Sequence, residues 1–432
     1  MVNIERGNAK EDGMVSTARE FDVVVFGATG FTGRLVARYL AQHGGDRRWA
    51  VAGRNEAKLH ALLAELGELA SGGAAPSVVV ADVGDEGSLK AMAARTRVVC
   101  TTVGPYALYG EAVVRACVEE GADYCDLTGE MDWVAEMIER YHEAARSAGV
   151  RIVHSCGFDS IPSDLGVLRL QQEAKRQWAE PAALAKFYLW DARGGFSGGT
   201  VASAAETVER ASRDAKVRER LADPYALYPA GEAPGADGGP QDGARFDRAI
   251  GAWTGPFMMA RVNEKVVRRS NALRGFEYGR DFRYGEVVKL GRGVGGAVGA
   301  WSMALGLGGL VAGLALGPTR ALLRRFVLPA AGEGPSEKTM EEGRFCVKVF
   351  GWKDERAMKS GNAPLVVRVE ADKDPGYGAT ALMLSESAML LADGEDALGD
   401  GVVRGGVLTT AAAMGSALIE RLELAGMVFE AE

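Results

Sequence analysis

Three glycines spaced three residues apart, Gly27, Gly30 and Gly33, could bind the phosphates of a dinucleotide. In such a loop the first glycine permits a tight turn, the second lets the backbone approach a pyrophosphate, and the third lets a helix pack closely on the preceding strand. The helix that follows points free N–H groups at the anion. The predicted phosphate loop consists of Gly27, Ala28, Thr29, Gly30, Phe31, Thr32 and Gly33.

The residues about twenty positions beyond the loop indicate which dinucleotide is bound. An NAD site usually has an Asp or Glu there, which holds the ribose hydroxyls. This chain has Arg54 instead, with Lys58 one helical turn later. A guanidinium in place of a carboxylate suits a 2′-phosphate, so the sequence favours NADP (NADPH) over NAD. The alternative is that Arg54 only caps a surface loop.

The ends of two further predicted strands should also reach the cofactor, because ligands of such sheets bind beyond the carboxyl ends of the strands. The third strand, in "SVVVADVGD", ends at Asp82, which we expect near the adenine. The fourth, in "RVVCTTVGP", ends in four residues expected beside the nicotinamide, namely Thr102, Val103, Gly104 and Pro105.

Three side chains near that position are candidates for proton transfer. Tyr106 and Tyr109 follow Pro105, and Asp159 follows the sixth predicted strand. Each could donate a proton or orient a substrate. The alternative for the tyrosines is that their rings only form a wall of the cofactor pocket. Other polar residues at strand ends could bind nicotinamide or substrate: Asp126, Thr128, Glu130, Ser160 and Asp164. Helix capping explains Ser163 and Asp164 equally well.

The elements that must position these residues are short β-branched runs alternating with helices. Six such runs lie in "VVVF", "WAVAGRN", "SVVVADVGD", "RVVC", "ADYCDLTGE" and "RIVHSCGFD". Strand–helix alternation predicts an α/β fold with an N-terminal doubly wound Rossmann-type parallel sheet. We expect this NADP-binding domain over residues 20–160, after a disordered leader over residues 1–19.

Periodicity weakens beyond residue 160. "FCVKVFGW" and "PLVVRVEAD" predict paired strands of a second α+β domain. We expect this substrate and dimerisation domain over residues 161–404. An amphipathic helix over 408–424 is expected within a C-terminal segment, residues 405–432, that returns to the Rossmann domain.

The second domain carries a Gly-rich hydrophobic segment, residues 293–319, without a charged residue. Basic residues flank it on both sides, and they could contact lipid phosphates. Three interpretations remain open: a helix pair inserted shallowly into one leaflet, a buried core or dimer interface, and a transmembrane span. A single crossing is disfavoured because it would separate the strands on either side of the segment.

Composition narrows the class of protein. A net charge of −8 gives no electrostatic footprint for nucleic acid. Five cysteines without paired spacing indicate reduced thiols and a cytoplasmic protein. Four scattered histidines predict no metal site, and we expect His154 to be a packed, hydrogen-bonded residue rather than a catalytic one.

Taken together, "GATGFTG", "AGR", "TTVGPYALYGEAVVRAC", "GADYCDLTGE" and "HSCGFDSIPSDLG" resemble the saccharopine dehydrogenase-like oxidoreductases. Within them the chain is most similar to the actinobacterial trans-acting enoyl reductases. Later motifs such as "GGFSGGTVAS" and "DPGYGAT" agree, and the resemblance extends from Phe21 to near the end of the chain.

The resemblance implies an NADPH-dependent oxidoreductase that reduces an enoyl C=C bond of a lipid or polyketide acyl chain. Peripheral contact with a membrane or lipid droplet through residues 293–319 would bring the enzyme to such substrates, and a homodimer is the usual assembly. Two alternatives stay open. One is a catalytically silent NADP-binding scaffold at a membrane or droplet. The other is a saccharopine-type amino-acid dehydrogenase, for which Arg268 and Arg269 could bind carboxylates.

Overall fold

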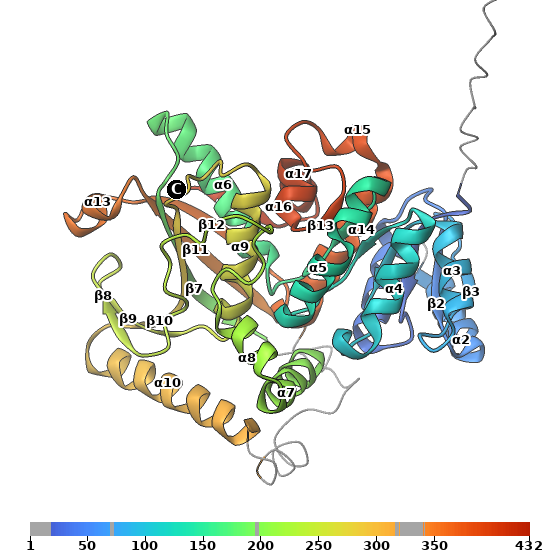
Figure 1. Ribbon diagram of the computed structural model, residues 1–432, viewed down its shortest axis with the longest axis horizontal. Coiled ribbons are helices and arrows are strands. Elements are labelled where there is room, and N and C mark those ends of the chain that lie inside the picture. Colours follow the sequence, from blue (N-terminus) through green and yellow to red (C-terminus); the bar gives the residue numbers. More distant parts are fainter. Residues whose placement is uncertain (1–18, 70–72, 195–197, 316–318, 320–339, 341) are drawn as a thin grey trace, which may run out of the picture.

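The computed structural model describes residues 19–69, 73–194, 198–315, 319, 340 and 342–432 (Figure 1). The predicted leader lies outside these residues except for Arg19, whose guanidinium donates a hydrogen bond to the Ala93 carbonyl. Two seven-stranded sheets organise the chain.

The first sheet is the predicted doubly wound sheet, and all of its strand pairs are parallel. Its order is β3-β2-β1-β4-β5-β6-β13, which extends a Rossmann sheet by one strand. β1 (Phe21–Phe26) is buried along almost its whole length, as a β-branched strand covered on both faces should be. The other strands are β2 (Trp49–Gly53), β3 (Ser77–Val80), β4 (Thr96–Thr101), β5 (Asp123–Cys125), β6 (Arg151–Val153) and β13 (Gly406–Leu408).

Helices connect these strands and cover the sheet. They are α1 (Phe31–His43), α2 (Glu56–Leu69), α3 (Glu86–Arg95), α4 (Tyr106–Glu120), α5 (Met131–Ala148) and α14 (Thr380–Asp393). α3, α4 and α5 pack in a row, while α14 packs beside α1 and against β1, β4 and β5. α14 comes from the far end of the sequence, so the first layer is built from both ends of the chain.

The second sheet is mixed, with the order β14-β12-β11-β7-β10-β9-β8. β7 pairs in parallel with β10 and antiparallel with β11, and β11 pairs with β12 as predicted. Its strands are β7 (Leu184–Arg193), β8 (Arg245–Asp247), β9 (Ala252–Pro256), β10 (Arg283–Gly291), β11 (Arg344–Trp352), β12 (Leu365–Ala371) and β14 (Val428–Ala431).

The other helices among the described residues lie around this second sheet and between the two sheets. They are α6 (Ile161–Trp178), α7 (Gly198–Arg213), α8 (Ala215–Ala222), α9 (Ala260–Leu273), α10 (Gly293–Ala315), α13 (Glu355–Lys359), the π-helical turn η1 (Pro375–Ala379), α15 (Glu395–Leu398), α16 (Thr410–Ala413) and α17 (Gly415–Leu424).

The C-terminal region differs from the expected single helix over 408–424. The return to the first sheet begins earlier, at η1 and α14, and includes β13. The chain then passes through α16 and α17 and leaves again, because β14 pairs with β12 of the second sheet. Almost every residue of α14 is buried. The helix therefore lacks the amphipathic pattern from which its packing against the first sheet could have been predicted.

The hydrophobic segment forms one helix, α10, which packs on β9, β10 and α7 at the edge of the molecule (Figure 1). Gly255 of β9 lets α10 approach closely, because a Cβ there would lie 3.1 Å from the Met303 sulfur. Residues Gly293–Ala315 form a single helix, and only 11% of its most apolar part is buried, so a position in the core of this chain does not fit; the leaflet contact and the dimer interface stay predictions. α10 has the length and composition to cross a membrane, with a mean hydropathy of 1.6. A single crossing does not fit, because β10 and β11 on either side of α10 both pair with β7.

Candidate functional site

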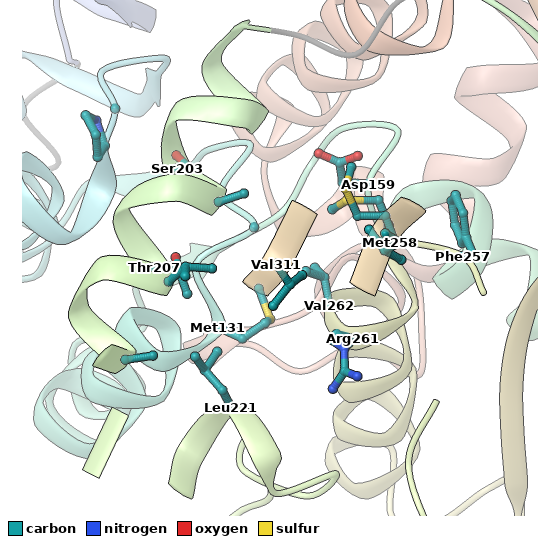
Figure 2. Close-up of a pocket in the computed structure, with 18 of the residues that line it drawn as sticks. Met131, Asp159, Ser203, Thr207, Leu221, Phe257, Met258, Arg261, Val262 and Val311 are labelled. Atoms are coloured by element: carbon teal, nitrogen blue, oxygen red, sulfur yellow. The ribbon is translucent and has the colours of Figure 1, made fainter. Parts of the chain in front are cut away.

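A cavity of about 900 Å³ lies between the first sheet and the helices of the second domain (Figure 2). One end is formed by loops at the carboxyl ends of β1, β4, β5 and β6. The other end is formed by α7, α8, α9 and α10 and is mostly apolar. A ligand pocket at the carboxyl edge of a doubly wound sheet is where nucleotide-dependent chemistry takes place in this fold.

The glycine loop has the geometry of a phosphate cradle. Gly27 has φ of +88°, and a Cβ at Gly33 would lie 2.2 Å from the Gly27 carbonyl oxygen, so neither position accepts a side chain. α1 begins after Gly30 without a side-chain cap, which leaves the first N–H groups of the helix available to an anion. Gly30, Phe31, Thr32 and Gly33 line the cavity. These features fit the pyrophosphate of a dinucleotide.

Thr102 and Val103 hold this loop in place from β4. The Thr102 hydroxyl donates a hydrogen bond to the Gly27 carbonyl oxygen at 3.3 Å, and a Cβ at Gly27 would lie 2.7 Å from a methyl group of Val103. Of the four residues predicted beside the nicotinamide, Thr102, Gly104 and Pro105 line the cavity, whereas Val103 packs behind the glycine loop.

Ala28 and Thr29 belong to the same turn, although neither lines the cavity. The Ala28 side chain is buried, and its N–H donates to the Ala52 carbonyl oxygen of β2 at 3.3 Å. That bond fixes the loop against the neighbouring strand. Only the residues from Gly30 onward therefore face the pocket directly.

The predicted 2′-phosphate and adenine residues lie on the strands beside β1. Arg54 follows β2 directly and is exposed, and exposed Lys58 lies in the first turn of α2. β2 is the neighbour of β1, so Arg54 follows the strand whose end normally contacts the ribose. The Asp82 carboxylate accepts the Gly84 N–H at 2.9 Å and thereby stabilises the turn after β3. None of these three lines the cavity.

The two tyrosines have different positions. The Tyr106 ring lines the cavity, but its hydroxyl donates to the Thr101 carbonyl oxygen at 3.2 Å and accepts the Leu127 N–H at 3.4 Å. Burial raises the pKa of Tyr106 well above its ordinary value. Tyr106 therefore matches the alternative of a wall residue. Tyr109 is 41% exposed on α4 and does not line the cavity, because the helix turns its side chain away from the loop end.

Two acids line the cavity, and Asp242 is paired with Arg261, so the acid that faces the cavity unpaired is Asp159 (Figure 2). It lies in the loop between β6 and α6, opposite Met258 and Phe257 of the second domain. Burial raises the pKa of Asp159 from 3.8 to about 6. Within the described part of the chain, no hydrogen bond or ion pair involves its carboxyl group. Such a carboxyl can hold a proton near neutral pH and release it to a bound molecule.

Glu130 connects the loop after β4 to α7. Its carboxylate accepts the N–H groups of Tyr106 and Ala107, both at 2.9 Å, and the Ser203 hydroxyl at 2.8 Å. These bonds cap α4 and hold α7 at the side of the cavity, so Glu130 has a positioning role.

The remaining predicted polar residues are buried in the framework. Asp126 accepts hydrogen bonds from the N–H groups of Thr128 and Ser155, and it pairs with His154 at 2.7 Å, as expected of a packed histidine. Asp164 accepts the hydroxyl of Thr410 on α16. The Ser160 hydroxyl donates to Asn263 at 3.2 Å.

Sequence reasoning missed the apolar half of the pocket. It is formed by residues such as Thr207, Leu221, Met258, Val262 and Val311 (Figure 2). The available signal was the helical spacing of small and apolar residues in "SAAETVERAS", which places 204, 207, 208 and 211 on one face.

The basic pair considered for a carboxylate substrate does not line the cavity. Arg268 is paired with Asp237 and Glu264 inside the second domain. Arg269 is buried and donates to the carbonyl oxygens of Leu227 and Val407. Neither guanidinium is available to bind a substrate in the pocket.

A doubly wound sheet, an open glycine cradle and a pocket beyond the strand ends define an NADP-dependent oxidoreductase. Residues 23–153 match the saccharopine dehydrogenase NADP binding domain. A Mycobacterium tuberculosis protein provisionally named a trans-acting enoyl reductase is 42% identical over 96% of this chain and 98% of its own length. The trans-acting enoyl reductase of Mycobacterium ulcerans is 38% identical over 97% of this chain and 99% of its own.

The solved structure of saccharopine dehydrogenase (L-Glu forming) from Saccharomyces cerevisiae has the same fold. It aligns with a TM-score of 0.50 and 13% identity, covering 95% of this chain and 99% of that one. The chain thus belongs to the trans-acting enoyl reductases, a branch of the saccharopine dehydrogenase-like oxidoreductases.

Proposed function

We propose that this enzyme uses NADPH to reduce the C=C bond of a lipid or polyketide acyl chain in which the double bond is conjugated to a carbonyl group. The nicotinamide supplies a hydride to the β-carbon, and the enzyme supplies a proton to the α-carbon. The products are NADP⁺ and the saturated chain. The names of the mycobacterial relatives support this reaction.

The main observation that supports an acyl-chain reductase is that the pocket is continuous. One cavity extends from the glycine cradle past the ends of β4, β5 and β6 to the apolar faces of four helices. An acyl chain needs such an apolar surface, whereas an amino-acid substrate needs paired charges for its carboxylates and amine. Arg268 and Arg269 lie outside the cavity. Two other arginines line it, but Arg261 is paired with Asp242 and Arg218 donates to the Ala211 carbonyl oxygen, which disfavours the amino-acid dehydrogenase.

We assign the proton to Asp159. It lies on the side of the pocket where the nicotinamide end of a dinucleotide binds in this fold, and a pKa of about 6 suits a group that transfers a proton near neutral pH. Tyr106 is the alternative donor, but both of the hydrogen bonds to its hydroxyl involve the protein backbone.

The test is to follow nicotinamide absorbance when purified protein is mixed with NADPH and a trans-2-enoyl thioester. We expect loss of absorbance together with formation of the saturated thioester. Gly33→Ala is the control, because its Cβ would collide with the Gly27 carbonyl and close the cradle. Tight NADPH binding without oxidation by any enoyl thioester would contradict the reductase and favour the silent scaffold.

We further propose that α10 rests on a membrane surface that contains anionic lipid. Four apolar side chains follow each other along its outer side, and two of them, Val294 and Leu305, are 81% and 71% exposed; the other two are Val298 and Trp301. They recur at positions i, i+4, i+7 and i+11, which places them on one face of the helix.

The surroundings of α10 carry the charge that a membrane surface attracts. Arg292 precedes the helix and is exposed, as are Arg245 and Arg248 near β8. Phe246 of β8 is a further exposed apolar side chain. An apolar helix face with a basic rim is typical of proteins that lie in the lipid headgroup region. Arg320, Arg324 and Arg325 lie outside the described residues.

Flotation with phosphatidylglycerol vesicles tests this contact. Replacing Trp301 and Leu305 by Glu should weaken vesicle binding roughly a hundredfold, because each side chain contributes about 1.5–3 kcal/mol when buried in apolar surroundings. Leu424→Glu is the matched control, since Leu424 is 91% exposed on α17. Equal loss in all variants, or no binding by the unaltered protein, would contradict the membrane contact. The cytoplasmic location and the homodimer remain predictions.

A further inference from the structure

α10 is apolar on two sides. Its outer side carries the exposed residues described above, and its inner side lines the pocket with residues 304, 307, 308, 311 and 315. These five positions follow the spacing i, i+3, i+4, i+7 and i+11, so they form one continuous face. Val311 is 50% exposed, and Gly308 and Ala315 are exposed as well, so the pocket is open along this part of α10.

Gly308 is the residue on this inner face that has no side chain. A Cβ at Gly308 would meet no atom within 4 Å. Gly255 and Gly296 are different, because a Cβ at either would approach neighbouring atoms to about 3 Å or less. Close contacts thus account for Gly255, which faces Leu290 and Met303, and for Gly296, which faces the Gly291 carbonyl, whereas Gly308 is exposed and lines the cavity. A glycine lowers the stability of the helix that contains it, so Gly308 makes α10 less stable while it leaves the pocket wider.

The wall facing α10 is also suited to a hydrocarbon chain. Met131, Val262 and Thr207 project toward Val311 in the same part of the pocket (Figure 2). Met side chains are flexible and can adjust to chains of different shape. Asp159 is the ionisable residue assigned to the reaction. Arg218, Asp242 and Arg261 also line the cavity, whereas the lining that α10 itself contributes is apolar.

We infer that the acyl chain lies along the inner face of α10 and that Gly308 determines how long or how branched a chain the enzyme accepts. This inference rests on the proposed function, because it takes an acyl chain as the occupant of the pocket. The inference adds Gly308 as a residue that determines substrate specificity, a role that cannot be read from the glycine cradle or from Asp159.

The experiment compares Gly308→Leu with Gly309→Leu. Gly309 is the adjacent helical glycine and does not line the cavity, and a Cβ there would likewise meet no atom within 4 Å. Both changes raise helix propensity equally, so a difference between them reports the pocket. The measurement is kcat/KM for a series of trans-2-enoyl thioesters from short to long chains.

We expect Gly308→Leu to lower kcat/KM for long chains at least about tenfold relative to short chains, because the added side chain displaces about two methylene groups from an apolar surface. Gly309→Leu should leave the ratio unchanged. Equal chain-length profiles for the two variants would overturn the inference.

Binding of the fluorescent fatty acid cis-parinaric acid separates this inference from the proposed reaction. Probe binding that is weaker in Gly308→Leu than in Gly309→Leu would support the chain position. If the protein also reduced no enoyl thioester, the absence of turnover would refute only the reductase. Active protein whose probe binding and chain-length profile are the same in both variants would refute the chain position and retain the reductase.

Discussion

Asp159→Asn should make the protein more stable and less active at the same time. Burial raises the pKa of Asp159 from 3.8 to about 6, so the folded state holds a proton that the unfolded chain releases. Above pH 6 the carboxylate of the folded protein is ionised in an unfavourable environment. The rise in pKa corresponds to about 2–3 kcal/mol of lost stability, after allowance for partial contact of the side chain with solvent.

The sign of the pH dependence follows from the raised pKa. Below pH 4 the carboxyl group is protonated in both states and the group makes no unfavourable contribution. As the pH rises from about 4 to 6, the unfolded chain binds fewer protons than the folded one, and stability falls. Asparagine does not titrate, so the stability advantage of Asp159→Asn should grow over this window and stay constant above it.

Urea unfolding of both proteins between pH 4 and pH 8 measures this difference, with Asp46→Asn as a control at an exposed carboxylate. The same samples are assayed for NADPH binding and turnover. Unchanged NADPH affinity with turnover reduced about 10²–10⁴-fold would identify the lost proton donor. A stability difference that does not depend on pH would refute the raised pKa, and full activity of Asp159→Asn would refute the catalytic role.

Three further substitutions test the pocket. Arg54→Asp should shift preference from NADPH to NADH by at least about a hundredfold in the ratio of dissociation constants, measured by fluorescence titration. Gly33→Ala should abolish binding of both nucleotides, because its Cβ would lie 2.2 Å from the Gly27 carbonyl oxygen; retained binding would show that the loop can rearrange. Tyr106→Phe should keep most of its turnover and lose about 1 kcal/mol of stability, since its hydroxyl bonds to the backbone at Thr101.

The sequence was sufficient to predict the first six strands of the first sheet and the cofactor loop, but not β13. Buried parallel strands are nearly continuous apolar runs, and the glycine spacing has a specific steric cause that the distances at Gly27 and Gly33 confirm. Local patterns of this kind do not depend on where the rest of the chain lies. The positions of the strands in the second domain were also indicated by alternating residues, as in β12.

Relationships between distant segments could not be predicted in the same way. Tyr109 follows the fourth strand as closely as a ligand-binding residue should, yet the first turn of α4 points it into solvent. The apolar half of the pocket is assembled from α7, α8, α9 and α10. Only Asp214 separates α7 from α8, but β8 and β9 lie between α8 and α9, and β10 lies between α9 and α10. Composition alone could not distinguish a surface helix from a buried one at α10, because both of its faces are apolar.

The route of the chain between the two sheets has a consequence for how the protein can be divided. The segment after Asp374 supplies α14 and β13 to the first sheet and then β14 to the second. The first layer needs β13 and the second needs β14, both from the C-terminal part of the chain, so neither half is an independent folding unit. We expect one cooperative unfolding transition. If the chain from the second domain to its end were exchanged as one contiguous piece, by recombination or in evolution, strands would be removed from both layers. New substrates are therefore more accessible through point changes along α7–α10.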